Sequence, residues 1–262
     1  MIGNNAILLE SVGTSGTFSA KVKEHIVDGT LHPFILPDDR FNYPHGPRQS
    51  LHCIIDAASA IDYIATKIYG KNNFTYEVLN EMTKEIPPGS GGIIVIPFIH
   101  GQRVPYLPYA QLYIQRYNPR RHKKRYLIRA TMEGVGYAMK YGFELLRKGM
   151  EKQNIPEPLQ VTITGGGAKG EEFSQIRADI YAKELVNFHT EGAAAGASYI
   201  AAAGVLDRPI REVLKRLFKP FEFTRIKPRE DNIKIYEKGY ESYLEVLEEA
   251  IERRFKQKPL II

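Results

Sequence analysis

The feature that most constrains this chain is a run of three glycines between a β-prone segment and a helical one. Residues 161–182 read VTITGGGAKGEEFSQIRADIYA, with Phe173, Ile176 and Ile180 at helical spacing after the glycines. Glycine lets the main chain approach a ligand closely, and a helix N-terminus presents unpaired N–H groups and a partial positive charge. The segment therefore predicts a strand, a loop and a helix that together bind an anionic ligand such as a nucleotide. The alternative is a tight turn that binds nothing.

A second glycine-bearing turn occurs near the start of the chain. Residues 6–22, AILLESVGTSGTFSAKV, carry β-prone residues on both sides of Gly13–Gly16 and predict two strands joined by a short turn. Thr14, Ser15 and Thr17 place hydroxyl groups among glycines that permit unusual backbone angles. Such a turn offers N–H and O–H donors to phosphate oxygens, but an ordinary hairpin turn shows the same pattern.

The remaining elements alternate between helices and strands. Apolar spacing predicts helices over 50–69, 76–84, 127–147, 192–204 and 232–257, and a buried strand over 93–98. Residues 28–48, rich in proline, histidine and aspartate, predict a surface excursion. Cys53, the single cysteine, falls in the first helix, where we expect a buried structural role. The small side chains of 192–204 allow close packing against a neighbour. This alternation predicts an α/β domain.

Composition excludes several classes of protein. With 43% hydrophobic and 25% charged residues among 262, the chain has the composition of a globular protein. No apolar run approaches the ~20 residues of a membrane span, and the N-terminus shows no leader pattern. A cytoplasmic protein without a membrane partner is therefore expected.

The net charge of +6 is concentrated in residues 116–125, RYNPRRHKKR. A basic cluster of this kind is a candidate footprint for nucleic acid, and salt-sensitive binding to arbitrary DNA would identify it. No aromatic platform accompanies the cluster, so we favour a solvated loop and expect no nucleic-acid partner.

Six segments, taken in order, resemble the C-terminal half of the FGGY carbohydrate kinases. These sugar and glycerol kinases have the actin-like ATPase fold, a ribonuclease H-like mixed sheet flanked by helices. The segments are SVGTSGTF (11–18), DAASAIDY (56–63), IPFIHGQRVPY (96–106), RATMEGVGYA (129–138), GGGAKGEEFSQIRADI (165–180) and EGAAAGASYIAAAGV (191–205). The resemblance covers nearly the whole chain and implies a single C-terminal domain over 1–262.

The resemblance also implies a nucleotide site. ATP would lie between two domains and transfer its γ-phosphate, with Mg²⁺, to a sugar or polyol hydroxyl. The β- and γ-phosphates would be held by Gly13, Thr14, Ser15 and Gly16. The adenosine and α-phosphate would be lined by Gly166, Gly167 and Ala168.

At three further positions the chain has a different residue where the glycerol kinases have one that contacts the nucleotide. Glu171 falls where the glycerol kinases place an adenine-contacting asparagine. Ala58 and Asp62 fall where those kinases have a nucleotide-contacting glycine and glutamine.

The chain departs from the family at the catalytic base. That base is an aspartate in a Gly-Asp-Asn-Ala type segment before the GTSG turn, and Met1–Val12 contain no aspartate. We therefore expect no catalytic residue and no metal ligand in this chain, and an N-terminal sugar-binding domain that is absent from it. A lobe that holds one side of ATP cannot orient a sugar hydroxyl, so we expect the isolated chain to be inactive.

Two interpretations of such a lobe remain open. It is either the ATP-binding part of a sugar kinase, as an excised domain, a split-gene product or a truncated relative, or a non-catalytic nucleotide-binding or regulatory module of the same fold. The GTSG and AASAIDY segments are more similar to the xylulose and gluconate kinases than to the glycerol kinases, and xylulose is our first guess for the sugar. A homodimer is a further expectation.

Overall fold

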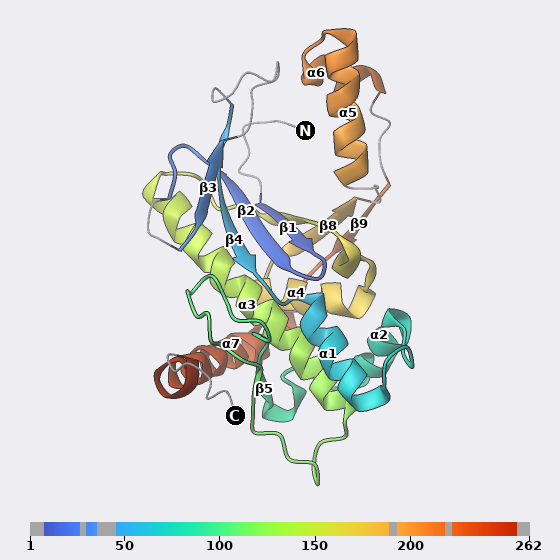
Figure 1. Ribbon diagram of the computed structural model, residues 1–262, viewed down its shortest axis with the longest axis vertical. Coiled ribbons are helices and arrows are strands. Elements are labelled where there is room, and N and C mark those ends of the chain that lie inside the picture. The colour runs from blue at the N-terminus through green and yellow to red at the C-terminus, as the bar shows by residue number, and fades with distance from the viewer. Residues whose placement is uncertain (1–7, 27–29, 36–45, 189–192, 218–221, 256–262) are drawn as a thin grey trace.

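The computed structural model describes residues 8–26, 30–35, 46–188, 193–217 and 222–255 (Figure 1). In chain order the elements are β1 Leu8–Val12, β2 Gly16–Val22, β3 His32–Ile35, β4 Arg48–Ile54, α1 Ala58–Tyr69, α2 Tyr76–Lys84, η1 Ser90–Gly92, β5 Ile94–Ile96, β6 Tyr113–Gln115, α3 Arg125–Lys152, β7 Gln160–Thr164, η2 Gly166–Lys169, α4 Glu171–Tyr181, β8 Glu184–Phe188, α5 Ala193–Leu206, α6 Ile210–Leu217, β9 Phe223–Ile226, α7 Glu230–Ala250 and η3 Ile251–Phe255.

The main sheet has seven strands in the described residues, in the order β3-β4-β2-β1-β7-β8-β9. β1 and β2 form an antiparallel hairpin, whereas β1 pairs with β7 in parallel, Leu9 opposite Thr162 and Ser11 opposite Thr164. Because parallel strands end at the same edge of a sheet, the turn after β1 and the loop after β7 lie next to each other. The mixed sheet with flanking helices is the α/β architecture predicted from the sequence.

The core lies between the sheet and α3, the longest helix (Figure 1). Phe18 of β2 stacks on Phe143 of α3 at 5.6 Å between ring centroids, and Tyr181 of α4 meets Phe18 edge-on at 5.6 Å. A Cβ built at Gly142 would lie 1.9 Å from Cδ2 of His52 on β4. The absence of a side chain at Gly142 therefore allows α3 to approach β4 closely.

The predicted helix over 50–69 is wrong in its first part. Residues 48–54 form β4, in which buried Ser50, His52 and Ile54 alternate with partly buried Leu51 and Cys53. A period of two in burial is that of a strand, and β4 pairs with β2 along its whole length. The apolar spacing of this stretch fits both periods, and sheet pairing selects the strand. Cys53 is therefore half-buried in a strand rather than in a helix.

Other differences concern the edges of the molecule. The predicted strand over 93–98 exists as β5, but it pairs with β6 in a separate two-stranded sheet. β3 is a strand within the stretch predicted as an excursion, of which residues 28–29 and 36–45 lie outside the described residues. The α5 helix forms as predicted, but close packing is not seen along its described side chains. Most of them are exposed, and a Cβ at Gly196 or Gly204 would meet no atom within 4 Å.

The other helices follow the predictions closely. The α2 helix has the predicted bounds, α3 extends the predicted 127–147 at both ends, and α7 with η3 occupies most of 232–257. No helix in the described part of the chain is long and apolar enough to cross a bilayer.

Candidate nucleotide-binding site

A cavity of about 510 Å³ opens where the hairpin turn, the glycine loop after β7 and helices α1, α2 and α4 meet. Of the residues predicted from the sequence, the cavity is lined by Gly13, Thr14, Ala58, Asp62, Gly166, Gly167 and Glu171. Ser15, Gly16 and Ala168 lie outside its lining. The structure thus brings together residues from three segments that are far apart in the sequence.

The hairpin turn is fastened to the start of α1 through its carbonyl groups. The Thr14 carbonyl oxygen accepts hydrogen bonds from the N–H of Ala57 (2.9 Å) and from the N–H and hydroxyl of Ser59 (3.3 and 2.9 Å). The Gly13 oxygen accepts one from the N–H of Ala58 (3.0 Å). The first N–H groups of α1 are therefore satisfied by the turn and are not available to a phosphate.

The opposite side of the turn is exposed. Thr14 and Ser15 are both accessible to solvent, and no described residue forms a hydrogen bond with either hydroxyl. Gly16, in contrast, is buried, and a Cβ there would lie 2.7 Å from Sδ of Met139 and 3.0 Å from Cγ1 of Ile54. Gly16 therefore serves packing, whereas Thr14 and Ser15 can present donors to a ligand.

The glycine loop presses against the end of β1. Gly165 has a φ of 87°, and a Cβ there would lie 2.4 Å from the Val12 oxygen. A Cβ on Gly167 would lie 2.7 Å from Cγ1 of Val12, whereas a Cβ on Gly166 would meet no atom within 4 Å. Gly166 is thus the glycine of this loop that faces open space beside the cavity.

A buried ion pair fixes the Gly167 carbonyl group of this loop. Arg177 of α4 donates from Nη2 to the Gly167 oxygen at 2.9 Å and pairs through Nη1 with Glu10 of β1. The Tyr181 hydroxyl also donates to Glu10, at 2.6 Å. Burial raises the pKa of the Glu10 carboxyl, and the Arg177 guanidinium opposes that rise. Ala168 is held separately, because its oxygen accepts from the Asn187 amide at 3.0 Å.

The far wall of the cavity is made by α2 and the start of α4. Oδ1 of Asn80 accepts a hydrogen bond from the Phe173 N–H at 3.1 Å, so a side chain of α2 caps the N-terminus of α4. The Tyr76 hydroxyl donates to Asp62 at 2.6 Å, which links α2 to α1. Burial and the Asp62 carboxylate raise the pKa of the Tyr76 hydroxyl. Asp62 therefore orients a tyrosine at the cavity wall.

The lining combines apolar and charged groups. Ile61, Met132 and Phe173 supply apolar surface, and Lys84 lies 2.6 Å from Glu81 and 3.7 Å from Glu171. Tyr76, Asn80 and Lys84 were not predicted as site residues. The apolar spacing of 76–84 predicted the helix α2, but it did not indicate which face of α2 would pack against α4.

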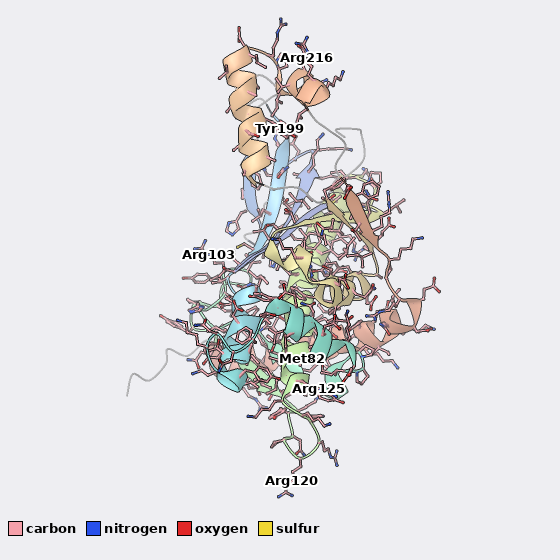
Figure 2. All side chains as sticks on the ribbon, turned by 90° about the vertical axis from the view of Figure 1, so that its right-hand side faces the viewer. Met82, Arg103, Arg120, Arg125, Tyr199 and Arg216 are labelled. Carbon is pink, nitrogen blue, oxygen red and sulfur yellow. The ribbon has the colours of Figure 1, made fainter. Side chains whose placement is uncertain are left out.

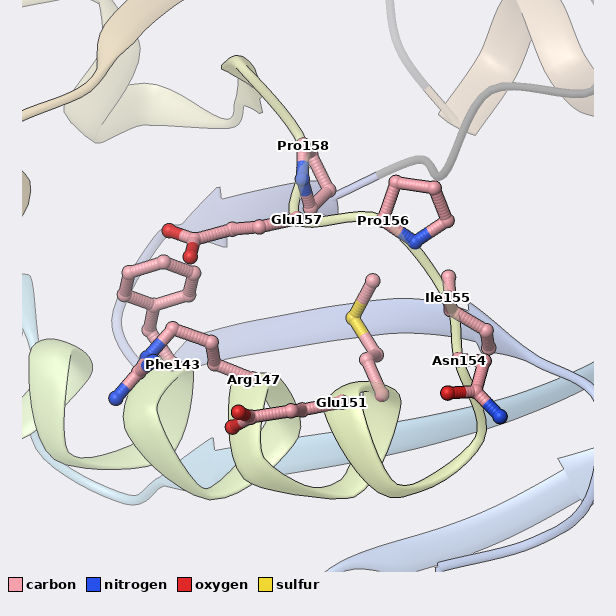
Figure 3. A pocket seen from close by; sticks show the side chains of 9 residues that line it. Phe143, Arg147, Glu151, Asn154, Ile155, Pro156, Glu157 and Pro158 are labelled. Atoms are coloured by element: carbon pink, nitrogen blue, oxygen red, sulfur yellow. The ribbon is translucent and has the colours of Figure 1, made fainter.

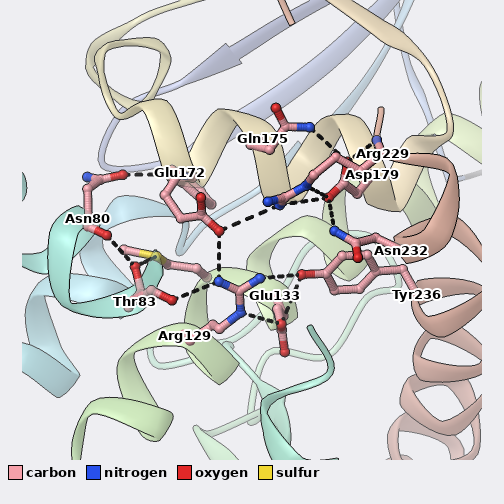
Figure 4. Close-up of polar contacts among 12 residues, drawn as sticks. Asn80, Thr83, Arg129, Glu133, Glu172, Gln175, Asp179, Arg229, Asn232 and Tyr236 are labelled. Atoms are coloured by element: carbon pink, nitrogen blue, oxygen red, sulfur yellow. Dashed lines mark hydrogen bonds and ion pairs between the residues drawn. The ribbon is translucent and has the colours of Figure 1, made fainter. Parts of the chain in front are cut away.

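A buried polar network supports this wall from behind (Figure 4). Arg129 of α3 donates to Glu133 (3.1 Å), to Glu172 of α4 (2.8 Å), to the Thr83 oxygen of α2 (2.9 Å) and to the hydroxyl of Tyr236 on α7 (2.9 Å). Burial raises the pKa of Glu133, and the adjacent Arg129 opposes it. The network joins four helices and fixes α2 and α4 relative to each other.

A second cavity, of about 430 Å³, lies at the end of α3 (Figure 3). Two of its charged side chains pair with residues outside the lining, because Arg147 donates to Glu144 at 2.9 Å and Glu157 pairs with Lys183 at 2.7 Å. None of the residues predicted from the sequence lines it. We therefore assign the candidate site to the first cavity.

Two other features of the described residues bear on partners. They contain no group of three or more His, Cys, Asp or Glu side chains placed to hold a metal ion. The basic segment 116–125 forms a loop between β6 and the start of α3, with Arg120 at its tip (Figure 2). Arg125 at its end pairs with Glu85 at 2.5 Å.

Comparison with known proteins identifies relatives of the chain. The xylulose kinase of Haemophilus influenzae is 29% identical over 89% of this chain and 45% of its own length. The xylulose kinase of Lactococcus lactis is 27% identical over 95% of this chain and 48% of its own length. The chain thus spans about half the length of the curated relatives it matches.

Solved structures show the same fold. Gluconate kinase from Lactobacillus acidophilus superposes with a TM-score of 0.78 at 18% identity, over 95% of this chain and 48% of that one. Ligand-bound xylulose kinase from the same organism gives the same values. These neighbours confirm the actin-like ATPase fold. The model of the FGGY family of carbohydrate kinases, C-terminal domain, matches residues 8–205. On that match, the chain belongs to the FGGY family of carbohydrate kinases, in the region of the family's C-terminal domain.

Proposed function

We propose that this chain is the ATP-binding part of a kinase that transfers the γ-phosphate of ATP to a sugar or polyol hydroxyl. The observation that carries the proposal is the cavity of about 510 Å³ lined by both the hairpin turn and the glycine loop, at the edge where the parallel strands β1 and β7 end. Ligands of open α/β sheets bind outside the carboxyl ends of such strands. Membership of a carbohydrate kinase family supports a nucleotide as that ligand.

In this proposal the adenosine lies against Tyr76 and Phe173, which both line the cavity. The α-phosphate lies at Gly166, where no side chain obstructs it. The β- and γ-phosphates reach the exposed donors of Thr14 and Ser15. Mg²⁺ would arrive on the phosphates, because this ion keeps several waters and is usually bound through substrate phosphates and one or two carboxylates.

The identity of the acceptor sugar is less constrained than that of the nucleotide. The relatives named above are xylulose kinases, and a solved neighbour is a gluconate kinase, so xylulose and gluconate are the first acceptors to test. The chain matches only 45–48% of its xylulose kinase relatives, and we propose that the sugar and the catalytic aspartate belong to the part of a kinase outside that match. Residues 1–262 would then be one domain, inactive without that part. The cytoplasmic location and the homodimer stay predictions.

Titration calorimetry with ADP tests the nucleotide site. We expect an affinity no tighter than about micromolar, or roughly 8 kcal/mol, because contacts come from one lobe. Gly166→Val should abolish binding, since its side chain enters open space beside the cavity without touching the protein. Gly204→Val, which also meets no atom within 4 Å but lies on α5, is the matched control.

Three outcomes would contradict parts of this proposal. Binding that survives Gly166→Val would show that the loop is only a turn, and nanomolar binding by the wild type would show that the lobe is complete by itself. Sugar-dependent ADP release by the 262-residue chain alone would contradict the inactive state. Sugar-dependent release that appears only on adding a separately expressed N-terminal lobe would favour the kinase over a non-catalytic module.

A further inference from the structure

The segment after β5 is tied to the start of α1 by one buried carboxylate. Asp56 is 1% exposed, and its Oδ2 accepts hydrogen bonds from the N–H groups of Ile99 and His100, both at 2.8 Å. Its Oδ1 lies 2.8 Å from Nδ1 of the His100 ring. Three contacts to one carboxylate therefore fix both the main chain and the ring at His100.

The carboxylate also fixes the tautomer of this ring. An ionised carboxylate only accepts hydrogen bonds, so Nδ1 of His100 carries the proton and donates it to Asp56. The other nitrogen, Nε2, points away from Asp56. The His100 side chain is 69% exposed, and Nε2 is therefore available to a ligand.

Asp56 connects His100 to the hairpin turn. The Ser59 hydroxyl lies 3.0 Å from Oδ1 of Asp56 and 2.9 Å from the oxygen of Thr14. His100 is thus two side chains away from the turn that we propose for the β- and γ-phosphates. Neither Asp56, Ser59 nor His100 lines the cavity, whereas Thr14 does. The contacts through Asp56 and Ser59 therefore connect His100 to a residue that lines the cavity.

A positively charged side chain lies on the same segment. Arg103 is exposed, as Figure 2 shows, and it lies close enough to Cys53 on β4 for its charge to lower the pKa of that thiol, against the effect of burial. Cys53 is opposite Thr17 of β2, three residues after Thr14. The charge of Arg103 therefore lies near β4, the strand that pairs with β2 of the hairpin.

We propose that His100 binds the terminal phosphate of the nucleotide, with Asp56 as the positioning residue. In the bound state the ring carries protons on both nitrogens, donating from Nδ1 to Asp56 and from Nε2 to a phosphate oxygen, and the buried carboxylate compensates its charge. The proposal rests on the nucleotide site described above. It adds a contact that a triphosphate makes and a monophosphate does not.

The test compares AMP with a non-hydrolysable ATP analogue carrying Mg²⁺, by calorimetry on the full 262-residue chain. The informative variant is His100→Asn, because the asparagine amide can still donate to Asp56 and keep the segment in place, but it lacks Nε2. We expect the ratio of analogue to AMP affinity to fall about tenfold, the loss of a hydrogen bond between charged groups, with AMP affinity unchanged. His100→Ala should lower the ratio equally.

Tyr106→Ala is the matched control, since Tyr106 is 79% exposed on the same segment. Its ratio should equal that of the wild type. If His100→Asn still binds AMP and its ratio of analogue to AMP affinity stays within twofold of wild type, the proposed role of His100 is wrong, while the nucleotide site itself stands. A wild-type chain that binds neither nucleotide would overturn the nucleotide site itself, and this inference with it.

Discussion

The hairpin turn and the glycine loop are both glycine-rich, but their glycines do different things. In each segment one glycine faces open space, Gly13 in the turn and Gly166 in the loop. At the other positions a side chain would collide with a neighbouring residue, with Met139 at Gly16 and with Val12 at Gly165. The number of glycines in a motif therefore overstates the number of positions where main chain can meet a ligand.

The two segments also differ in how they are held. The carbonyl oxygens of the turn accept hydrogen bonds from residues at the start of α1, and the one from the Ser59 hydroxyl is exposed to solvent. The loop is tied by Arg177, whose side chain is fully buried together with Glu10. Surface hydrogen bonds are worth little individually, whereas breaking a buried pair leaves an uncompensated charge. The loop should accordingly be the more fragile of the two.

Arg177→Met should have the largest effect. It leaves Glu10 buried without its cation and removes the donor to the Gly167 oxygen, and we expect a loss of about 3–5 kcal/mol in the free energy of unfolding. Urea denaturation measures this. Adding Glu10→Gln to Arg177→Met should recover part of the loss, and a double variant no more stable than the single one would contradict the account.

Gly167→Val should have a smaller effect, of about 1–3 kcal/mol, because its side chain would meet Val12. Gly166→Val should change the free energy of unfolding by less than about 0.5 kcal/mol, because its side chain meets no protein atom. Thermal denaturation of the two variants side by side checks the contrast. Equal destabilisation would show that the two neighbouring glycines share one role.

Ser59→Ala should lower the free energy of unfolding by about 1 kcal/mol, less than Arg177→Met and more than Gly166→Val. The variant removes a partly exposed hydroxyl that contacts Thr14 and Asp56 but leaves the main-chain bonds of the turn intact. Chemical denaturation measures the change. A loss as large as that of Arg177→Met would mean that the turn depends on this side chain as much as the loop depends on its buried pair.

Both segments could be located from the sequence because their signals are local. Glycine and hydroxyl residues between β-prone runs predict a turn, and helical spacing after Gly167 predicts α4. The prediction of a helix over the first part of 50–69 was wrong because the spacing of Leu51 and Ile54 fits both a helix and a strand. Hydrogen-bonded pairing with β2 makes this stretch a strand. The cavity wall formed by Tyr76 and Asn80 depends on how α2 meets α4, which spacing along one helix does not encode.

The contact between Arg177 and Glu10 spans 167 positions of the sequence. Closing so long a segment is entropically costly and slow, so contacts of this kind form only when most of the intervening chain is already in place. During synthesis, β1 leaves the ribosome long before its partner arginine exists. The glycine loop can therefore reach its final shape only after β7 has joined β1. A polypeptide that began after β1 would keep every glycine of the motif and lose the carboxylate that positions the arginine beside them.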